Sequence, residues 1–244
     1  ALIPSKFHKY LLPVLIFFSL TLIYLHNLSA SVYGGDVGDL VTAATVMGVA
    51  HPPGYPLFTL LGFLLTRIEF ISPAFMVGLI SVFSASLGAT IFFLLCLEFT
   101  KNKFISLFCT LVLAFNYLFF FYAEIAEVFA LNNLFVILLF FLSYLFYKKK
   151  DLNVLYALSF FVGLSFTNHQ TIIFIFPSLL ILVLKHYRKI FFKKEVILKN
   201  IFFLFLGLSI YAYVPIAASQ NPVVNWDRVK DLDSFLRLIL RQDY

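Results

Sequence analysis

Long apolar stretches recur along this chain, and they limit the folds open to it more than any other feature. A helix needs about 20 apolar residues to cross a bilayer. Runs near that length occupy residues 11–28, 74–99, 104–122, 128–147, 153–168, 170–184 and 200–217, with a shorter one at 54–68. Only 12% of the residues are charged, against about 25% in soluble domains. The sequence therefore predicts an all-α integral membrane protein embedded in the lipid bilayer.

The charged residues predict how these runs cross the membrane. If residues 54–68 spanned it, Lys101 and Lys103 would lie opposite Lys6 and Lys9, against the positive-inside rule. If residues 54–68 return to the side they came from, thirteen of the 18 basic residues share the cytoplasmic side and nine of the 12 acidic residues share the outer side. We therefore expect about seven transmembrane helices, with an interfacial or re-entrant helix at 54–68 in the first outer loop. The cytoplasmic set is Lys6, Lys9, Lys101, Lys103, Lys148, Lys149, Lys150, Lys185, Arg188, Lys189, Lys193, Lys194 and Lys199.

Charge and cysteine usage exclude several other classes. The net charge of +6 does not indicate nucleic-acid binding, because the basic residues form short clusters between apolar runs and topology explains them. Cys96 and Cys109 lie within apolar runs, which argues against a disulfide framework or a cysteine metal site. Residues 11–28 are followed by no convincing small-residue cleavage site, so we interpret them as a retained first span rather than a signal peptide.

Two segments are expected along the chain. Residues 1–217 form a polytopic transmembrane module, and residues 218–244 form an extracytoplasmic interfacial segment that we expect to continue in a longer protein. In that second segment, apolar residues alternate at helical spacing with Arg237, Arg241 and Asp243. This pattern is typical of a helix lying at the membrane surface.

Under this threading, the polar residues that interrupt apolar sequence gather on the outer face. They come from distant parts of the chain, namely residues 34–39, 50–56, 124–127, 167–170 and 225–227. An ionisable group at membrane depth costs roughly 2.5–3.5 kcal/mol on insertion scales. Their convergence on one face therefore indicates a functional site.

Asp36 and Asp39 are the candidate catalytic residues. They stand in a glycine-rich stretch after the first span, where the backbone can bring carboxylates close to a substrate or a metal. Either carboxylate could accept a hydroxyl proton, and a divalent cation held by the pair is a second possibility. For Asp39 the alternative is a structural role as the cap of a helix beginning near Leu40.

The remaining candidates would bind substrate, and each also has a structural reading. His51 either contacts a phosphate or holds its proline-rich loop. Glu124 and Glu127 are three residues apart and are expected to share a helical face, where they could equally serve solvation at the interface. Asn168 and His169 separate two apolar runs and could simply form a tight turn. The substrate-binding candidates are Tyr55, His51, Arg67, Glu124, Glu127, Asn168, His169, Trp226 and Arg241.

Several sequence blocks resemble the DUF2723 family, which includes transmembrane protein O-mannosyltransferases. They are Gly35-Asp36-Val37-Gly38-Asp39, the run from Gly48 to Leu57 with its His-Pro-Pro-Gly-Tyr-Pro core, the run from Ala123 to Asn132, the run from Gly163 to His169, and the run from Asn221 to Trp226. They occur in the family's order and cover most of residues 30–244. The block around His51 is the most specific of them.

The resemblance implies a GT-C glycosyltransferase fold, with an acidic catalytic residue in the first outer loop and a polyprenyl-phosphate sugar as donor. Asp36 matches the acidic position. Family members often read Asp-Ser-Gly-Glu where this chain has Asp-Val-Gly-Asp, so Asp39 is a shorter second carboxylate. The implied reaction inverts the anomeric carbon, with Asp36 assisting deprotonation of an acceptor hydroxyl. His51, His169, Arg67 and Arg241 are the candidates to meet the leaving phosphate.

The expected protein is thus a membrane glycosyltransferase of the bacterial inner membrane or the endoplasmic reticulum, with its active site extracytoplasmic. It would transfer a sugar, with mannose as one candidate, to a hydroxyl of a protein or glycan acceptor. The alternatives are a lipid or small-molecule transporter or flippase and a noncatalytic membrane subunit. A transporter predicts broken spans in repeated halves, and no such pair is evident in the sequence.

Overall fold

The computed structural model describes residues 7–185 and 193–242, and every named element within these ranges is a helix. Four of the charged residues used to predict the topology lie outside the described residues. They are Lys6, Arg188 and Lys189, assigned to the cytoplasmic side, and Asp243, assigned to the outer side. The elements are α1 (Phe7–Asn27), α2 (Val37–Thr45), α3 (Pro56–Thr66), α4 (Pro73–Thr100), α5 (Lys103–Ala114), α6 (Tyr117–Ala123), α7 (Val128–Lys149), α8 (Leu152–Phe166), η1 (Gln170–Ile175), α9 (Phe176–Leu184), α10 (Lys194–Leu208), η3 (Ser209–Ala212), α11 (Tyr213–Ser219), η4 (Trp226–Arg228) and α12 (Leu232–Leu240).

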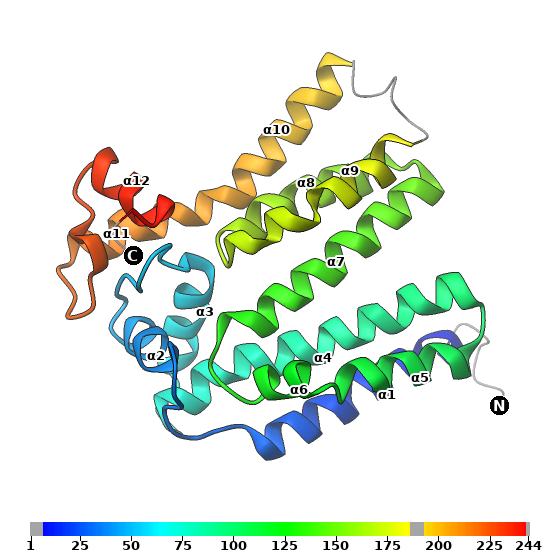
Figure 1. The fold of residues 1–244 in the computed structure, drawn as a ribbon, viewed down its shortest axis with the longest axis horizontal. Helices are drawn as coiled ribbons and strands as arrows, with labels where there is room; N and C mark the ends of the chain where they lie inside the picture. Colours follow the sequence, from blue (N-terminus) through cyan, green and yellow to red (C-terminus); the bar gives the residue numbers. More distant parts are fainter. Residues whose placement is uncertain (1–6, 186–192, 243–244) are drawn as a thin grey trace.

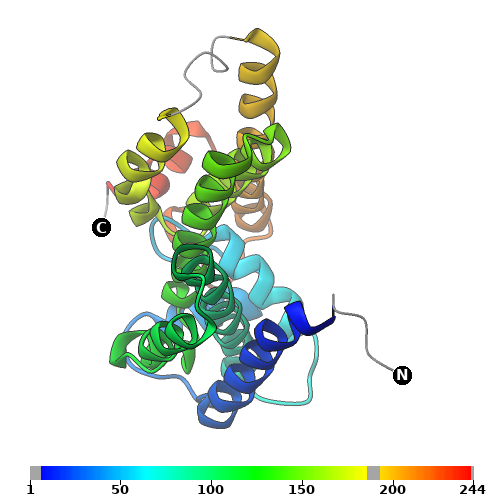
Figure 2. The same cartoon turned by 90° about the vertical axis from the view of Figure 1, so that its right-hand side faces the viewer.

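The long helices run back and forth between two ends of the molecule (Figure 1). One end carries α2, α3, α11 and α12, and the other carries the turns after α4 and α7. Helix α4 packs against α1, α5 and α7, whereas α8 packs against α7 and α10. Seen at right angles, α1, α4 and α5 form one group and α7 to α10 the other (Figure 2).

Among the described residues, four helices are long and apolar enough to cross a membrane, namely α1, α4, α7 and the continuous stretch Lys194–Ser219. A fifth span is possible if α5 and α6 count as one, although they are bent by 68° at a short break. The expected single run at 104–122 is therefore interrupted. Helices α8 and α9 are shorter apolar helices. The protein is thus a membrane protein with four or five candidate spans by length.

Helix α3 is the segment that we expected not to cross. Its 11 residues cover roughly 16 Å, about half of a hydrocarbon core of ~30 Å. Its first turn is buried against the rest of the protein, with Phe58 and Thr59 fully shielded from solvent. Helix α3 lies at the same end as α2 and α12 (Figure 1).

The turns at the opposite end follow from local chemistry. Lys101 ends α4 in the left-handed conformation, and the Asn102 side chain then accepts from the Phe104 and Ile105 N–H groups to start α5. Lys150 and Asp151 repeat this arrangement between α7 and α8. A side-chain oxygen that accepts from these first amides is the usual helix N-cap. Both turns therefore reverse the chain within a few residues.

Two helices approach so closely that their contact excludes side chains. A Cβ atom on Gly163 of α8 would lie 2.1 Å from the Leu204 carbonyl oxygen, and one on Gly207 of α10 would lie 2.2 Å from the Phe160 carbonyl oxygen. Small residues allow this backbone contact between helices in membranes. The pair fixes α10 on α8, and α10 leads directly into the segment that reaches the site.

We predict that the two ends of the molecule lie on opposite sides of the membrane. In a variant whose native cysteines are replaced by alanine, Glu69→Cys should react with an impermeant thiol reagent in intact cells. Asn102→Cys should react only after permeabilisation, because its turn carries lysines that the positive-inside rule assigns to the cytoplasmic side. Both positions are exposed, so access to reagent is matched. Labelling of Asn102→Cys in intact cells would reject this threading.

Candidate active site

Asp36 presents an exposed carboxylate at the start of α2. Gly35 has a φ of +79°, a conformation that glycine adopts without strain, and it turns the chain into the helix. Asp36 occupies the N-cap position, yet its side chain makes no capping hydrogen bond. The carboxylate is 52% exposed. It is therefore available to a substrate.

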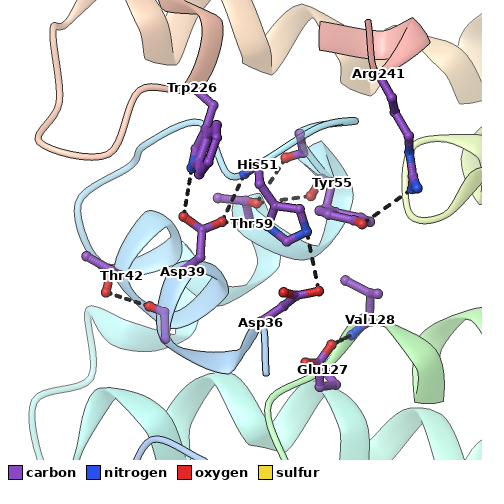
Figure 3. A network of polar contacts seen from close by, with 12 residues as sticks. Asp36, Asp39, Thr42, His51, Tyr55, Thr59, Glu127, Val128, Trp226 and Arg241 are labelled. Atoms are coloured by element: carbon purple, nitrogen blue, oxygen red, sulfur yellow. Dashed lines mark hydrogen bonds and ion pairs between the residues drawn. The ribbon is translucent and has the colours of Figure 1, made fainter. Parts of the chain in front are cut away.

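Asp39 does not cap a helix at Leu40, so that structural alternative is wrong. Helix α2 already begins at Val37, which places Asp39 in its first turn. The Asp39 carboxylate points instead to other segments of the chain (Figure 3). One oxygen, Oδ2, accepts from the His51 backbone N–H at 2.9 Å and lies 2.8 Å from His51 Nδ1. The other oxygen, Oδ1, accepts from the Trp226 indole N–H at 2.9 Å.

His51 lies between the two aspartates. Because a carboxylate oxygen only accepts hydrogen bonds, the contact with Asp39 places a proton on Nδ1 of the ring. Nε2 then faces Asp36, at 3.5 Å from its Oδ2. The His51 side chain is only 5% exposed, so its position is fixed by packing as well as by Asp39. The imidazole thus connects the partly buried Asp39 carboxylate to the exposed Asp36 carboxylate (Figure 3).

The hydrogen bonds also set the charge of Asp39. Burial alone would raise the pKa of Asp39, but hydrogen bonds from His51 and Trp226 outweigh burial and lower that pKa below its ordinary value. A carboxylate that accepts several hydrogen bonds holds its charge more firmly and is a weaker base. Asp39 is therefore suited to positioning His51, whereas Asp36 is the carboxylate left open for proton transfer.

The segment after α10 holds the His51 loop in place. Val49 and Asn225 form a parallel bridge, in which the Val49 N–H donates to the Val224 carbonyl oxygen at 2.9 Å. The Tyr213 hydroxyl donates to the Gly48 carbonyl oxygen at 2.8 Å. A Cβ atom on Gly48 would lie 2.4 Å from the Val224 oxygen, so the close approach requires glycine there.

Glu127 is a shielded acid beside Asp36. Its side chain is 5% exposed, and its Oε2 accepts from the Val128 N–H at 3.3 Å. Burial, and secondly the negative charge of Asp36, raise the pKa of Glu127 to about 7. Glu124 and Glu127 do not share a helical face, as we had expected, because α6 ends at Ala123 and α7 begins at Val128. Glu127 adjoins Asp36, while Glu124 lines a separate cleft with Phe115 and Phe120.

Tyr55, His169 and Arg241 form a second group at the same end. Arg241 Nη2 donates to the Tyr55 hydroxyl at 3.4 Å, and His169 stacks on the Tyr55 ring with centroids 5.8 Å apart. His169 Nδ1 accepts from the Thr171 N–H at 3.2 Å, so a neutral ring carries its proton on Nε2. Burial, and then the charge of Arg241, lower the pKa of His169 to about 4. His169 is therefore a neutral hydrogen-bond donor near pH 7.

The other predicted residues have different positions. Asn168 is fully buried, and its Nδ2 donates to the Val128 carbonyl oxygen at 3.1 Å, so the turn between α8 and η1 is tied to the start of α7. Arg67 donates to the Thr45 carbonyl oxygen at 2.8 Å and lies over the Phe63 ring. These contacts set Arg67 apart from the Tyr55 and His51 groups.

The sequence did not predict Tyr213 as part of this end, and it placed Gln170 there with residues 167–170 but not among the substrate-binding candidates. Gln170 donates to the Ile239 carbonyl oxygen at 2.7 Å and so fixes α12 against η1. Tyr213 stands within an apolar run, where no local pattern distinguishes a tyrosine with a structural hydrogen bond from one that only packs. Gly48, by contrast, stood in the block preceding His51.

A polar cleft of about 600 Å³ opens beside Asp39 and Trp226. Its other lining residues are Val223, Val224, Asn225, Asp227, Arg228 and Arg237. Within residues 7–185 and 193–242, no group of three or more histidine, cysteine or acidic side chains is arranged to hold a metal ion. The space between Asp36 and Asp39 is instead bridged by the His51 ring, so the donor set does not fit a divalent cation.

Comparison with known proteins identifies similar sequences. Residues 36–191 match the family described as protein O-mannosyl-transferase TMEM260 N-terminal domain. Over 95% of its length, the chain is 30% identical to protein O-mannosyl-transferase tmem260 of Dictyostelium discoideum and 34% identical to protein O-mannosyl-transferase TMEM260 of Mus musculus. It spans 30% and 34% of the lengths of these relatives. No solved structure matches.

We predict that Glu127 makes the protein less stable as pH rises from about 5 to 8. Its folded-state pKa of about 7 exceeds the ordinary 4.5, so over this interval the folded protein binds more protons than the unfolded chain, and stability falls as pH increases. The effect is on the order of 2 kcal/mol. Thermal unfolding of Glu127→Gln should lose this pH dependence, whereas the exposed-site control Glu69→Gln should retain it. Equal pH dependence in Glu127→Gln would contradict the assignment.

Proposed function

This chain belongs to the family of protein O-mannosyl-transferase TMEM260 N-terminal domains, and we propose that it carries the catalytic groups of a membrane glycosyltransferase. The enzyme transfers a sugar, with mannose the favoured candidate, from a polyprenyl-phosphate donor to a hydroxyl of a protein acceptor. The observation that carries the proposal is the exposed Asp36 carboxylate, held beside His51 at the polar end of the helices. The names of the relatives support the sugar and the acceptor class.

The proposed reaction is a direct displacement at the anomeric carbon. The acceptor oxygen forms a bond to that carbon as its proton passes to Asp36, and the bond from the carbon to the phosphate oxygen breaks with its electron pair leaving on the phosphate. Attack opposite the leaving group inverts the configuration. Asp36 fits the role of base better than Asp39, because the hydrogen bonds from His51 and Trp226 leave Asp39 less basic and less accessible.

The leaving phosphate needs hydrogen-bond donors and positive charge. Arg241, the Tyr55 hydroxyl and His169 Nε2 supply these in one group. Arg67 is the weaker candidate, since its guanidinium already binds Thr45 and lies over Phe63. The acceptor would approach from the water side through the polar cleft beside Asp39.

The proposed arrangement in the membrane has seven passes, formed by α1, α4, α5 with α6, α7, α8, η1 with α9, and α10. Helix α3 remains at the outer interface in this arrangement. Two features support it, namely the shared location of the basic turns at one end (Figure 1) and the placement of α2, α3 and α12 at the other. The active site is then extracytoplasmic, and the architecture is that of a GT-C enzyme.

We predict that Asp36→Asn abolishes sugar transfer while the protein still folds. Asparagine keeps the shape of the side chain but cannot take the proton, and general-base assistance contributes about 10²–10⁴-fold in rate. Incorporation of labelled mannose from a polyprenyl-phosphate donor into protein would be measured at matched membrane expression. Glu69→Gln removes an exposed carboxylate from a different loop and should transfer normally. Near-normal turnover in Asp36→Asn would remove Asp36 from the catalytic role.

We predict further that Arg241→Gln weakens donor binding more than turnover. Loss of a hydrogen bond from a charged donor costs about 1.5–3 kcal/mol, so KM for the lipid-phosphate donor should rise roughly 10- to 100-fold. The comparison variant is Arg67→Gln, whose guanidinium contacts Thr45 instead. An equal rise in KM for the two variants would show that the phosphate does not lie at the Tyr55 and His169 group.

A further inference from the structure

A cleft with aromatic walls lies where α5 bends into α6, apart from the Asp36 site. The 68° bend between the two helices opens a space of about 410 Å³. We call it the aromatic cleft, and its lining residues are Phe115, Tyr117, Phe120, Phe121 and Glu124. Nothing in the proposed transfer reaction uses it.

Its walls are aromatic rings that pack on one another. Phe115 stacks on Phe120 with centroids 5.8 Å apart, and Tyr117 stacks on Phe121 at 6.1 Å. Tyr33, from the loop before α2, meets Phe121 edge to face at 5.6 Å. Tyr117 is nevertheless 75% exposed. Its ring is therefore ordered by its neighbours while remaining accessible to a ligand.

The one charged group in this lining is Glu124. Its Oε1 is shielded from solvent and has no hydrogen-bond partner among the described residues. The titratable side chain facing it from α1 is Tyr24, but the Tyr24 hydroxyl already donates to the Ala114 carbonyl oxygen at 2.9 Å. Burial raises the pKa of Glu124 to about 6, so the carboxylate is charged at pH 8. Glu124 as a whole is only partly buried, but its shielded oxygen lacks a donor that a bound cation could replace.

We propose that the aromatic cleft binds the ammonium group of a membrane lipid headgroup. Aromatic faces attract ammonium ions and are the usual walls of quaternary-ammonium sites, and the Glu124 carboxylate supplies the opposite charge. Phe108 and Val112 precede Phe115 at helical spacing, on the same face of α5, and are 68% and 58% exposed. A lipid whose headgroup enters the cleft can lay its acyl chains along that face, which a soluble partner would not match.

The test uses short-chain lipids and the purified protein at pH 8. Dihexanoyl phosphocholine should raise the melting temperature in a saturable manner, and dihexanoyl phosphoglycerol, which lacks an ammonium group, should do so only weakly. For Glu124→Gln, the half-saturating concentration of the choline lipid should rise roughly tenfold or more. The control Glu69→Gln removes an exposed carboxylate outside the cleft and should behave as the unmodified protein. The half-saturating lipid concentrations of the variants are compared with that of the unmodified protein. A variant that is merely less stable without lipid therefore does not count as one that binds lipid more weakly.

A second variant covers the case in which Glu124→Gln does not fold. Tyr117→Leu keeps an apolar side chain at an exposed position but removes the ring, and it should weaken the choline lipid severalfold. Tetramethylammonium chloride tests whether the ammonium group alone is sufficient for binding or whether the rest of the lipid is also needed. The proposal is overturned if tetramethylammonium stabilises as well as the lipid, if phosphoglycerol matches phosphocholine, or if the folded variants bind the choline lipid unchanged.

Discussion

The carboxylate of Asp39 is the contact on which the candidate site depends. It accepts hydrogen bonds from the His51 backbone and from the Trp226 indole, and it fixes the His51 ring through Nδ1. These three residues come from α2, from the loop before α3 and from the segment after α11. Because the ring then faces Asp36, the surroundings of the exposed Asp36 carboxylate depend on the partly buried Asp39 carboxylate. Asp39 thus joins the segment after α1 to the last part of the described chain.

The general fold could be predicted from the sequence because lipid imposes simple requirements. Apolar runs at 74–99 and 128–147 became α4 and α7 with bounds close to those expected, since a helix is how a single apolar segment satisfies its backbone in a membrane. Asn102 lies between two lysines, Asp151 follows three, and each caps the next helix. Such turns depend on neighbouring residues alone, so local chemistry is sufficient to place them.

The details of the site depend on contacts that no local pattern carries. The role of Asp39 is decided by Trp226, a residue 187 positions later, so a cap was an equally reasonable reading of the sequence alone. The break after α5 is similar, because Asn116, which caps α6, is a single amide within the apolar run 104–122 and the bend becomes visible only in three dimensions. A second break, between the end of α6 at Ala123 and the start of α7 at Val128, separates Glu124 from Glu127. The sequence did predict that the polar segments lie together at one end of the molecule, because the distribution of basic and acidic residues indicates which loops share a side of the membrane.

The bridge between Val49 and Asn225 has a consequence for biosynthesis. A membrane protein is inserted from its N-terminus, so α1 and the segment after it reach the membrane long before residue 225 leaves the ribosome. Until then, His51 and Asp39 lack the bridge partner and the indole that hold them in place. The carboxylate pair therefore becomes ordered only after α10 has docked on α8 through its glycine contact. A chain arrested early in translation would contain every residue of the segment after α1, but these residues would lack the contacts that order them.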